Sequence, residues 1–239
     1  MKTLKITFAL IAVVLLSSCN FNINIGEDGN GNVVTEDRHI NEDFNQVRGS
    51  SGLDVYLTQG NENQVQVEAD DNLLQFIETY VEDGKLIVST SDNIGRATAK
   101  KVHITFKSLN VVEASSGADV IGNSVIKSES LALKSSSGAE LELEVVAKDL
   151  MAKTSSGSEM KLSGKAASLI ADASSGSELN AKGVLVLNCN AEASSGAEIT
   201  VNVSQKLEVN ASSGGEVNYY GNPAAVNKNK SRSGSVQKM

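Results

Sequence analysis

The chain has 239 residues, of which 40% are hydrophobic and 4% are aromatic, and its formal net charge is -8. This size and composition suffice for one domain with a continuous core, so a second domain is not required. The acidic balance argues against nucleic acid or anionic lipid headgroups as partners, because like charges repel.

The first residues are organised like a secretory leader. A short basic segment precedes the apolar run 6–16, which is too short to span a membrane as a helix. The run ends in Leu-Ser-Ser-Cys at 16–19, which resembles the bacterial lipobox, where the leader is cut before a Cys that is then acylated. We therefore expect residues 1–18 to be a lipoprotein signal peptide and Cys19 to be the lipidation site. A plain secretory leader cut near Ser18 is the alternative.

The segment before the repeats is predicted in two parts. Residues 19–32 are rich in Asn and Gly, which is typical of a flexible linker; a calcium loop at 26–32 lacks the required acidic spacing. Residues 33–110 alternate in short runs and predict an irregular β cap at one end of the fold. Within this cap, Glu-Asp-Gly-Lys at 82–85 predicts a hairpin, and 70–75 predict a single helical turn.

One phrase recurs through residues 111–223: Ser-Ser-Gly, a small residue, an acidic residue and an apolar residue. Its glycines are 21, 19, 19, 20 and 18 residues apart, and they are Gly117, Gly138, Gly157, Gly176, Gly196 and Gly214. Repetition at this period is typical of a solenoid, in which no single unit can bury its apolar face alone. Apolar and polar residues alternate within each copy, so each period predicts short strands joined by corners.

The same alternation predicts which side chains face the interior. In one copy Leu131 and Leu141 point inward, and the second Ser of each phrase shares their parity, with the Gly at an outward bend. In a later copy Leu185, Leu187 and Cys189 are predicted inward. Cys189 is then a buried free thiol that packs as a small hydrophobe, and the chain has no disulfide framework. We expect the repeated Ser hydroxyls to hydrogen-bond along the stack.

These observations predict an all-β fold, a right-handed parallel β-helix with coils of about 20 residues and a less regular N-terminal β cap containing a hairpin. The single domain spans 33–223, with the coils at 111–223. Pro223 is expected to block a further strand, so 224–239 are predicted to be a frayed C-terminal tail. A basic binding arm is the alternative, because this tail holds Lys228, Lys230, Arg232 and Lys238.

Five motifs occur in a fixed order along the chain: Phe-Asn-Gln-Val at 44–47, Ser-Gly-Leu-Asp-Val at 51–55, Asp-Gly-Lys-Leu-Ile at 83–87, the Ser-Ser-Gly coils, and Tyr-Gly-Asn-Pro at 220–223. This order resembles a known family, named putative auto-transporter adhesin, head GIN domain, over roughly residues 39–234. The resemblance implies an all-β, β-helix-like domain in envelope proteins of Bacteroidetes-type bacteria, often behind a lipoprotein leader. It supplies no catalytic residues.

An acidic residue stands two positions after each glycine of the phrase. In a stacked helix these residues form one outward column with neighbours about 4.8 Å apart. Two carboxylates at that distance in water repel by roughly 0.9 kcal/mol, so the column is tolerable without a ligand. We interpret it as a solvated face and assign no metal or cofactor; a Ca²⁺ site or a stripe for a cationic partner is the alternative. The residues are Asp119, Glu140, Glu159, Glu178, Glu198 and Glu216.

The repeated serines do not indicate a catalytic site. A nucleophile needs a base and an orienting partner, and the coils contain no His; His39 and His103 both lie in the cap region. A Ser-Lys pair is a formal alternative. A polysaccharide lyase is the best catalytic alternative, but the coils between 107 and 218 have neither the Arg that would meet uronate charge nor aromatic platforms for sugar rings.

The sequence therefore predicts a non-catalytic, lipid-anchored envelope protein, an outer-membrane lipoprotein with an adhesin-like, scaffolding or structural role. Its expected partners are the membrane, through acylated Cys19, and an envelope protein or an extracellular glycan. The runner-up is a cation- or glycan-binding module that uses the acidic column or the cap aromatics. A polysaccharide-active enzyme comes third.

Overall fold

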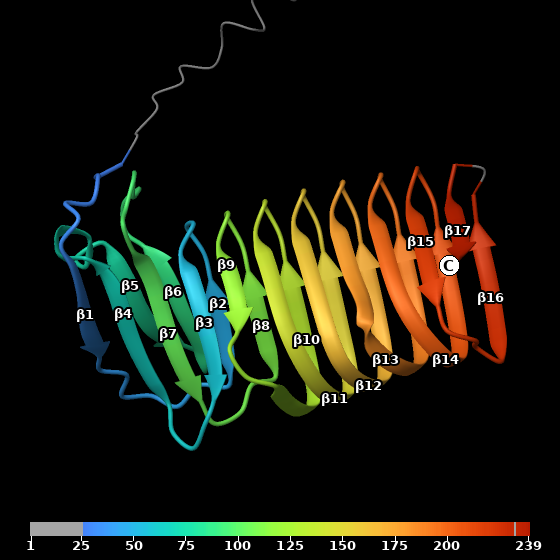
Figure 1. The fold of residues 1–239 in the computed structure, drawn as a ribbon, viewed down its shortest axis with the longest axis horizontal. Helices are drawn as coiled ribbons and strands as arrows, with labels where there is room; N and C mark the ends of the chain where they lie inside the picture. Colours follow the sequence, from blue (N-terminus) through green and yellow to red (C-terminus); the bar gives the residue numbers. More distant parts are fainter. Residues whose placement is uncertain (1–25, 232) are drawn as a thin grey trace, which may run out of the picture.

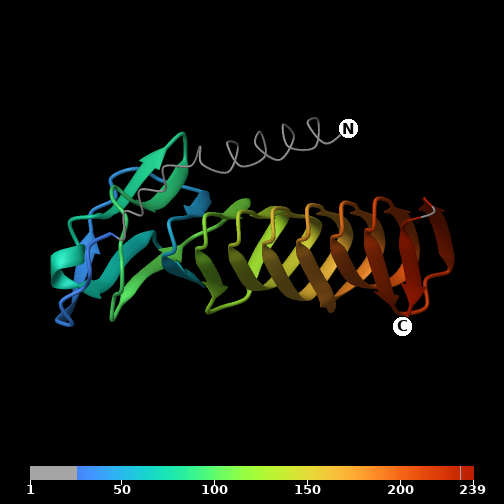
Figure 2. The same cartoon turned by 90° about the horizontal axis from the view of Figure 1, so that it is seen from above.

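The computed structural model describes residues 26–231 and 233–239, so Cys19 and the predicted leader lie outside the described residues. The described chain is an all-β solenoid whose strands stack along one axis, with a less regular β cap at its amino-terminal end (Figure 1). Seen from above, the coils form one row and the cap widens at its end (Figure 2). The predicted fold class is therefore confirmed. In the described ranges, no helix is both long and apolar enough to cross a membrane.

The cap differs from the coils because it contains antiparallel pairs. β1 pairs antiparallel with β4, β4 with β7, and β5 with β6. The β5–β6 pair is the predicted hairpin, and the short 3₁₀ helix η1 is the predicted helical turn. The elements are β1 (Val33–Arg38), β2 (Gln46–Gly49), β3 (Asp54–Gln59), β4 (Gln64–Asp70), η1 (Asp71–Leu73), β5 (Ile77–Glu82), β6 (Lys85–Thr90) and β7 (Lys100–Phe106).

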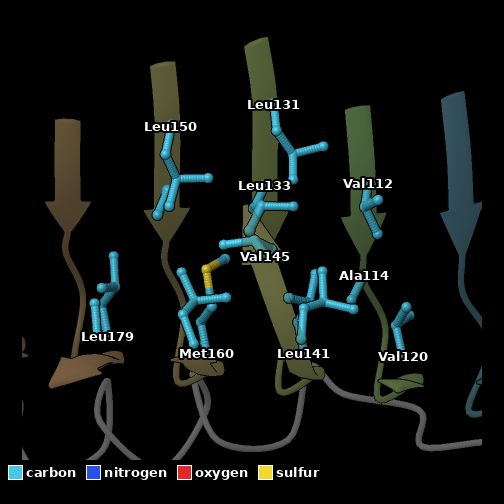
Figure 3. Packing of buried hydrophobic residues seen from close by; sticks show 14 of the residues in the cluster. Val112, Ala114, Val120, Leu131, Leu133, Leu141, Val145, Leu150, Met160 and Leu179 are labelled. Atoms are coloured by element: carbon cyan, nitrogen blue, oxygen red, sulfur yellow. The ribbon is translucent and has the colours of Figure 1, made fainter. Parts of the chain in front are cut away.

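From β8 onward the strands of each coil pair in parallel with those of the next. Leu141 lies opposite Met160, and Met160 opposite Leu179, so inward side chains form continuous columns of core (Figure 3). Such columns remove apolar area from water without a large residue in any one coil. The strands are β8 (Val111–Ala114), β9 (Asp119–Gly122), β10 (Ile126–Ser135), β11 (Glu140–Thr154), β12 (Glu159–Ala173), β13 (Glu178–Ala193), β14 (Glu198–Ala211) and β15 (Glu216–Tyr220).

The first coil does not stack in sequence order. β2 lies between β6 and β8, and β3 lies between β7 and β9. The chain therefore forms one coil, builds the cap on one side of it, and returns to stack the next coil on the other side.

Each Ser-Ser-Gly phrase forms the same tight corner. In one coil Ser156 and Gly157 have φ values of +56° and +67°, and the Ser158 N–H donates to the Ser155 carbonyl at 3.3 Å. Two consecutive left-handed residues closed by this bond form a type I′ turn. The second Ser is therefore exposed in every coil. The prediction that it points inward is wrong, because a simple alternation does not continue through two residues of positive φ.

The corners are joined to one another through the backbone. The Gly138 N–H donates to the Ser156 carbonyl at 3.1 Å, and the Gly157 N–H donates to the Ser175 carbonyl at 3.1 Å. The same bond recurs from Gly52 to Gly214, so the parallel ladder continues around the bend. Hydroxyl bonds between coils come from the serine after the glycine, since the Ser158 Oγ donates to the Ser135 carbonyl at 2.8 Å and the Ser177 Oγ donates to Thr154 Oγ1 at 2.9 Å.

The inward assignment of Leu185 and Leu187 is also wrong, since these side chains are 58% and 43% exposed. Register shifts interrupt the pairing of β13 with both of its neighbours. An extra residue in a strand reverses the facing of those that follow, so Val184 and Val186 enter the core instead. By Cys189 the predicted alternation of inward and outward side chains holds again. Cys189 is a buried free thiol as predicted, and burial raises the pKa of this thiol to about 12.

Residues 26–32 are bonded to the cap, which corrects the prediction that all of 19–32 is a flexible linker. The Gly29 N–H donates to the Arg96 carbonyl at 2.7 Å, and the Arg96 guanidinium pairs with Asp28 at 3.0 Å. The Gly31 N–H donates to the buried carboxylate of Asp70. These contacts fix the start of the described chain to one end of the solenoid.

The Asp70 carboxylate also accepts the N–H groups of Ala99 and Thr98, at 3.1 and 2.7 Å. Burial opposes its ionisation, but the backbone donors Ala99, Gly31 and Thr98 together outweigh burial and hold the pKa of Asp70 below its usual value. An ionised Asp70 therefore ties three chain segments together at the cap.

The coils continue beyond Pro223, so the frayed-tail prediction for 224–239 is wrong. β16 (Ala225–Lys230) pairs in parallel with β14, and β17 (Ser235–Lys238) pairs in parallel with β15. Pro223 lies in the connection between β15 and β16, where it does not interrupt the ladder.

Lysines occupy core-column positions in this last coil. The register places Lys228 opposite the buried Val209 and Lys238 opposite the buried Tyr219. Lys228 Nζ lies 4.9 Å from the centre of the Tyr219 ring. Inward-facing charge on an edge strand opposes the addition of another strand, so these lysines close the carboxyl-terminal end of the core.

Gly157→Ala is expected to lower the free energy of unfolding by about 1 kcal/mol, because an L side chain is strained at this left-handed φ. A Cβ at Gly157 would meet no atom within 4 Å, so only the backbone is affected. Gly164→Ala is the matched comparison and should cost much more, because its Cβ would lie 2.0 Å from the Val145 carbonyl oxygen. Urea unfolding measures the free energy of unfolding of both variants. Equal losses in the two variants would contradict the view that only the backbone is strained at Gly157.

Replacing both Lys228 and Lys238 by Val is expected to cause end-to-end assembly beyond the size of the wild type, because it exposes apolar side chains beside unpaired strand edges. Light scattering coupled to size-exclusion chromatography measures the change in mass. Lys148→Val with Lys165→Val alters the charge equally at exposed positions in the middle of the stack and should leave the mass of the wild type unchanged. A Lys228 and Lys238 variant with the same mass as the wild type would show that these lysines do not protect the end.

Candidate functional site

The structure brings all six predicted acidic residues together in one column. Each is the first strand residue after its corner, and successive members are register partners: Asp119 with Glu140, and so on through Glu159, Glu178 and Glu198 to Glu216. The parallel register makes this inevitable, since a residue at a fixed offset from the corner recurs at the same place in every coil.

The column is longer than the six residues. Asp54 lies opposite Asp119 at the cap side, and Ser235 follows Glu216 at the other end. The signal for Asp54 is present in the sequence, because Ser50 to Asp54 repeats the phrase with its acidic residue two positions after the glycine. The column from Asp54 to Ser235 has seven strand spacings and is therefore about 34 Å long. Beyond Asp54 the next register partner is Lys101, which ends the run of like charge.

Two carboxyls in the middle of the column have raised pKa values. Burial raises the pKa of Glu178, and the neighbouring carboxylates of Glu159 and Glu198 raise it further. Burial likewise raises the pKa of Glu140, with contributions from Glu159 and Asp119. Glu140 and Glu178 each lie between two acidic register partners, so each meets two like charges along the stack.

Partial compensation comes from the neighbouring outward column. Lys161 Nζ pairs with Glu142 at 2.9 Å, and Asn218 donates a hydrogen bond to Glu198 Oε1 at 3.0 Å. In the described part of the chain, no group of three or more His, Cys, Asp or Glu side chains is arranged to hold a metal ion. The acidic residues therefore form an outward stripe that its neighbouring column partly compensates.

A cleft of about 570 Å³ lies beside the column on β9, β11, β12 and β13. Its polar lining includes Glu142, Glu144, Lys161 and Asn180, and Lys182 lies at its edge with Nζ 4.3 Å from the centre of the Tyr220 ring. The cleft therefore mixes both signs of charge, and it has no aromatic residue among its lining residues.

Both histidines lie in the cap region. His103 stacks on Tyr56 with ring centres 5.1 Å apart, and its Nε2 lies 3.3 Å from Glu68, which also pairs with Lys101 at 3.0 Å. His39 lines a groove between β1 and β5. Within the described ranges, no hydrogen bond joins either His to a corner serine, so the repeated serines have no imidazole base.

Comparison with known proteins agrees with this architecture. The model of the family described as putative auto-transporter adhesin, head GIN domain, matches residues 43–223. No curated protein matches the chain significantly.

Several solved structures share the fold. A putative adhesin from Bacteroides fragilis has a TM-score of 0.83 and 19% identity, covering 90% of this chain and 100% of its own. A putative adhesin from Parabacteroides merdae has a TM-score of 0.70 and 22% identity, covering 89% and 98%. A putative lipid binding protein from Parabacteroides distasonis has a TM-score of 0.68 and 22% identity, covering 89% and 99%.

Glu178→Gln is expected to raise the free energy of unfolding at neutral pH by up to about 1 kcal/mol, because it removes repulsion from two neighbouring carboxylates that salt already screens in part. A carboxyl whose pKa is raised by folding binds protons more readily in the native state. Its ionisation therefore destabilises the fold as pH rises through the raised pKa, and the difference between wild type and variant should fade in acid.

Urea unfolding at pH 7 and in acidic buffer tests the direction of this change in the free energy of unfolding. Glu144→Gln makes the same change at an exposed position outside the column and should have a smaller effect. Equal effects of the two variants, or a difference that persists in acid, would show that the column does not strain the fold.

Proposed function

Because the chain belongs to the family described as putative auto-transporter adhesin, head GIN domain, we propose that it is a non-catalytic, lipid-anchored protein of the cell envelope with an adhesin-like or scaffolding role. The single observation that carries the proposal is the leader ending in Leu-Ser-Ser-Cys at 16–19. Acylation of Cys19 would provide enough hydrophobic area for stable anchoring to the outer membrane.

The position of residues 26–32 supports a defined orientation of the domain relative to the membrane. Residues 26–32 are bonded to the cap, so only residues 20–25 separate Cys19 from the folded domain. Six residues reach at most about 20 Å when fully extended. The cap then lies near the bilayer, and the coils carry the acidic column away from it.

A non-catalytic role fits the chemistry of the coils. Their serines are held at turns and lack an imidazole partner within the described residues, and their outer face is acidic. The family and two of the three structural neighbours named above are described as putative adhesins, which is consistent with display of a rigid surface. A glycan array, probed with and without Ca²⁺, distinguishes this role from the runner-up, a cation- or glycan-binding module.

Cys19→Ser is expected to abolish acylation and release the protein from the membrane fraction, because the chain then has no lipid anchor. Metabolic labelling with a palmitate analogue, followed by membrane fractionation, measures both effects. Cys189→Ser is the matched control and should keep the label, because Cys189 is buried in the core.

Label on wild type that survives Cys19→Ser would refute the anchor. Protease treatment of intact cells then assigns the side of the outer membrane. Loss of attachment or of envelope integrity on deletion, restored by wild type and not by Cys19→Ser, is the result expected for an anchored adhesin or scaffold.

A further inference from the structure

The chain contains a single Asn-Gly step, formed by Asn30 and Gly31. An Asn side chain loses its amide most readily before Gly, because no Cβ on the next residue hinders attack of that residue's backbone nitrogen on the amide carbon. Both residues are exposed, so water reaches the step. The step lies in residues 26–32, which fasten the start of the described chain to the cap.

The Asn30 amide is one of the groups that fasten residues 26–32. Its Nδ2 donates to Asp71 Oδ1, and the Asn32 Nδ2 donates to Asp71 Oδ2 at 2.8 Å. The Asn30 backbone N–H donates to Asn72 Oδ1 at 3.0 Å. The hydrogen bonds from Asn32 and Asn30 hold the pKa of Asp71 below its usual value. An ionised Asp71 therefore meets side-chain donors, and not acceptors, at positions 30 and 32.

Loss of the Asn30 amide is a hydrolysis in two steps. The Gly31 backbone nitrogen gives up its proton to solvent and forms a bond to Asn30 Cγ, while the bond from Cγ to Nδ2 breaks and ammonia leaves. Water then opens the resulting succinimide ring. Attack of water on Cγ gives Asp, and attack on the backbone carbonyl carbon gives isoaspartate, whose main chain runs through Cβ and Cγ. Water is the only co-reactant.

Either product reverses the contact with Asp71. A donor is replaced by a carboxylate beside the Asp71 carboxylate, and like charges at hydrogen-bond distance repel. Isoaspartate also lengthens the main chain before Gly31 by one carbon atom, which displaces the Gly31 N–H from its acceptor Asp70. Both products therefore favour release of residues 26–32 from the cap, and the lost amide does not form again in water.

The folded cap slows this reaction. The Gly31 N–H donates to the buried Asp70 carboxylate, and Asn30 Oδ1 accepts the Asn32 N–H at 2.9 Å. The attacking nitrogen and the amide are thus both held by other partners, and a nitrogen beside an ionised carboxylate loses its proton less readily. The reaction therefore follows a transient local opening in which residues 26–32 leave the cap.

We propose that Asn30 is a deamidation site, and that its conversion to Asp or isoaspartate releases residues 26–32 from the cap and prevents their return. The modification makes a reversible local opening permanent, so it acts as a one-way switch. With Cys19 acylated, release lengthens the link between anchor and domain from residues 20–25 to residues 20–32. This last consequence alone rests on the proposed function.

Ageing of the purified full-length protein in mildly alkaline buffer with detergent tests the site. Peptide mapping by mass spectrometry should find Asn30 deamidated faster than any other Asn, and an isoaspartate-specific methyltransferase should label the same peptide. Asp71→Ala should raise the rate about tenfold, because it removes the acceptor of both side-chain amides and favours the released state. Glu27→Ala removes an equal charge from an exposed residue of the same segment and should leave the rate near that of the wild type.

Asn30→Asp tests the release, because this variant carries the carboxylate of the product from the start. Hydrogen exchange in residues 26–32 should be about tenfold faster than in the wild type, with exchange in the coils unchanged. Asn123→Asp makes the same substitution at an exposed position between β9 and β10 and should leave exchange in residues 26–32 unchanged. Circular dichroism verifies that each variant folds.

Three results would each overturn the proposal. These are deamidation of Asn30 no faster than that of the other Asn residues, equal rates in Asp71→Ala and Glu27→Ala, or equal exchange of residues 26–32 in Asn30→Asp and Asn123→Asp. None of these measurements involves a membrane or an adhesive partner, so failure of the anchoring or adhesin role would leave them unaffected.

Discussion

The fold depends on one constraint, the repeated left-handed corner. Ser156 and Gly157 adopt positive φ values, which are unfavourable for an isolated serine, yet the same pair recurs in every coil at the same height. Because each corner is identical, the Gly N–H of one meets the Ser carbonyl of the next, and the ladder passes around the bend without a break. A corner of any other geometry would leave backbone groups unpaired at each coil, with a cost multiplied along the stack.

The same constraint produces the acidic surface. Once the corners superimpose, every residue at a fixed offset from them is forced into a column, whether or not its charge favours neighbours of its own kind. Glu178 therefore meets Glu159 and Glu198, and burial together with these two neighbours raises its pKa. The net repulsion is tolerated because the carboxylates face water and because columns of Leu, Val and Ala supply burial on the other side of the same strands.

The repeat made most of this predictable, and the failures have physical causes. The repeat period and the alternation of apolar and polar residues located the coils, the core and the acidic column, because a parallel stack places the same residue types at the same position in every coil. The outward direction of the Ser156 side chain was not predicted, because the alternation of inward and outward residues does not continue through a type I′ turn. Leu185 was wrongly predicted to point inward, because a bulge leaves no signal in the composition. The packing of β2 between β6 and β8 was also hidden, since alternation identifies strands but not the order in which they stack.

Both ends of the solenoid must limit the addition of further strands. A stack of parallel strands has an open edge at each end, and each edge must be either blocked or used. At the carboxyl-terminal end, Lys228 and Lys238 take positions that belong to the core in other coils, which makes a further coil unfavourable. At the cap, β1 is paired with β4, and the register places Glu36 and Arg38 of β1 opposite the buried Val67 and Val65. Charged residues therefore lie opposite the core at both ends of the stack, although one end is a regular coil and the other is the β cap to which residues 26–32 are bonded.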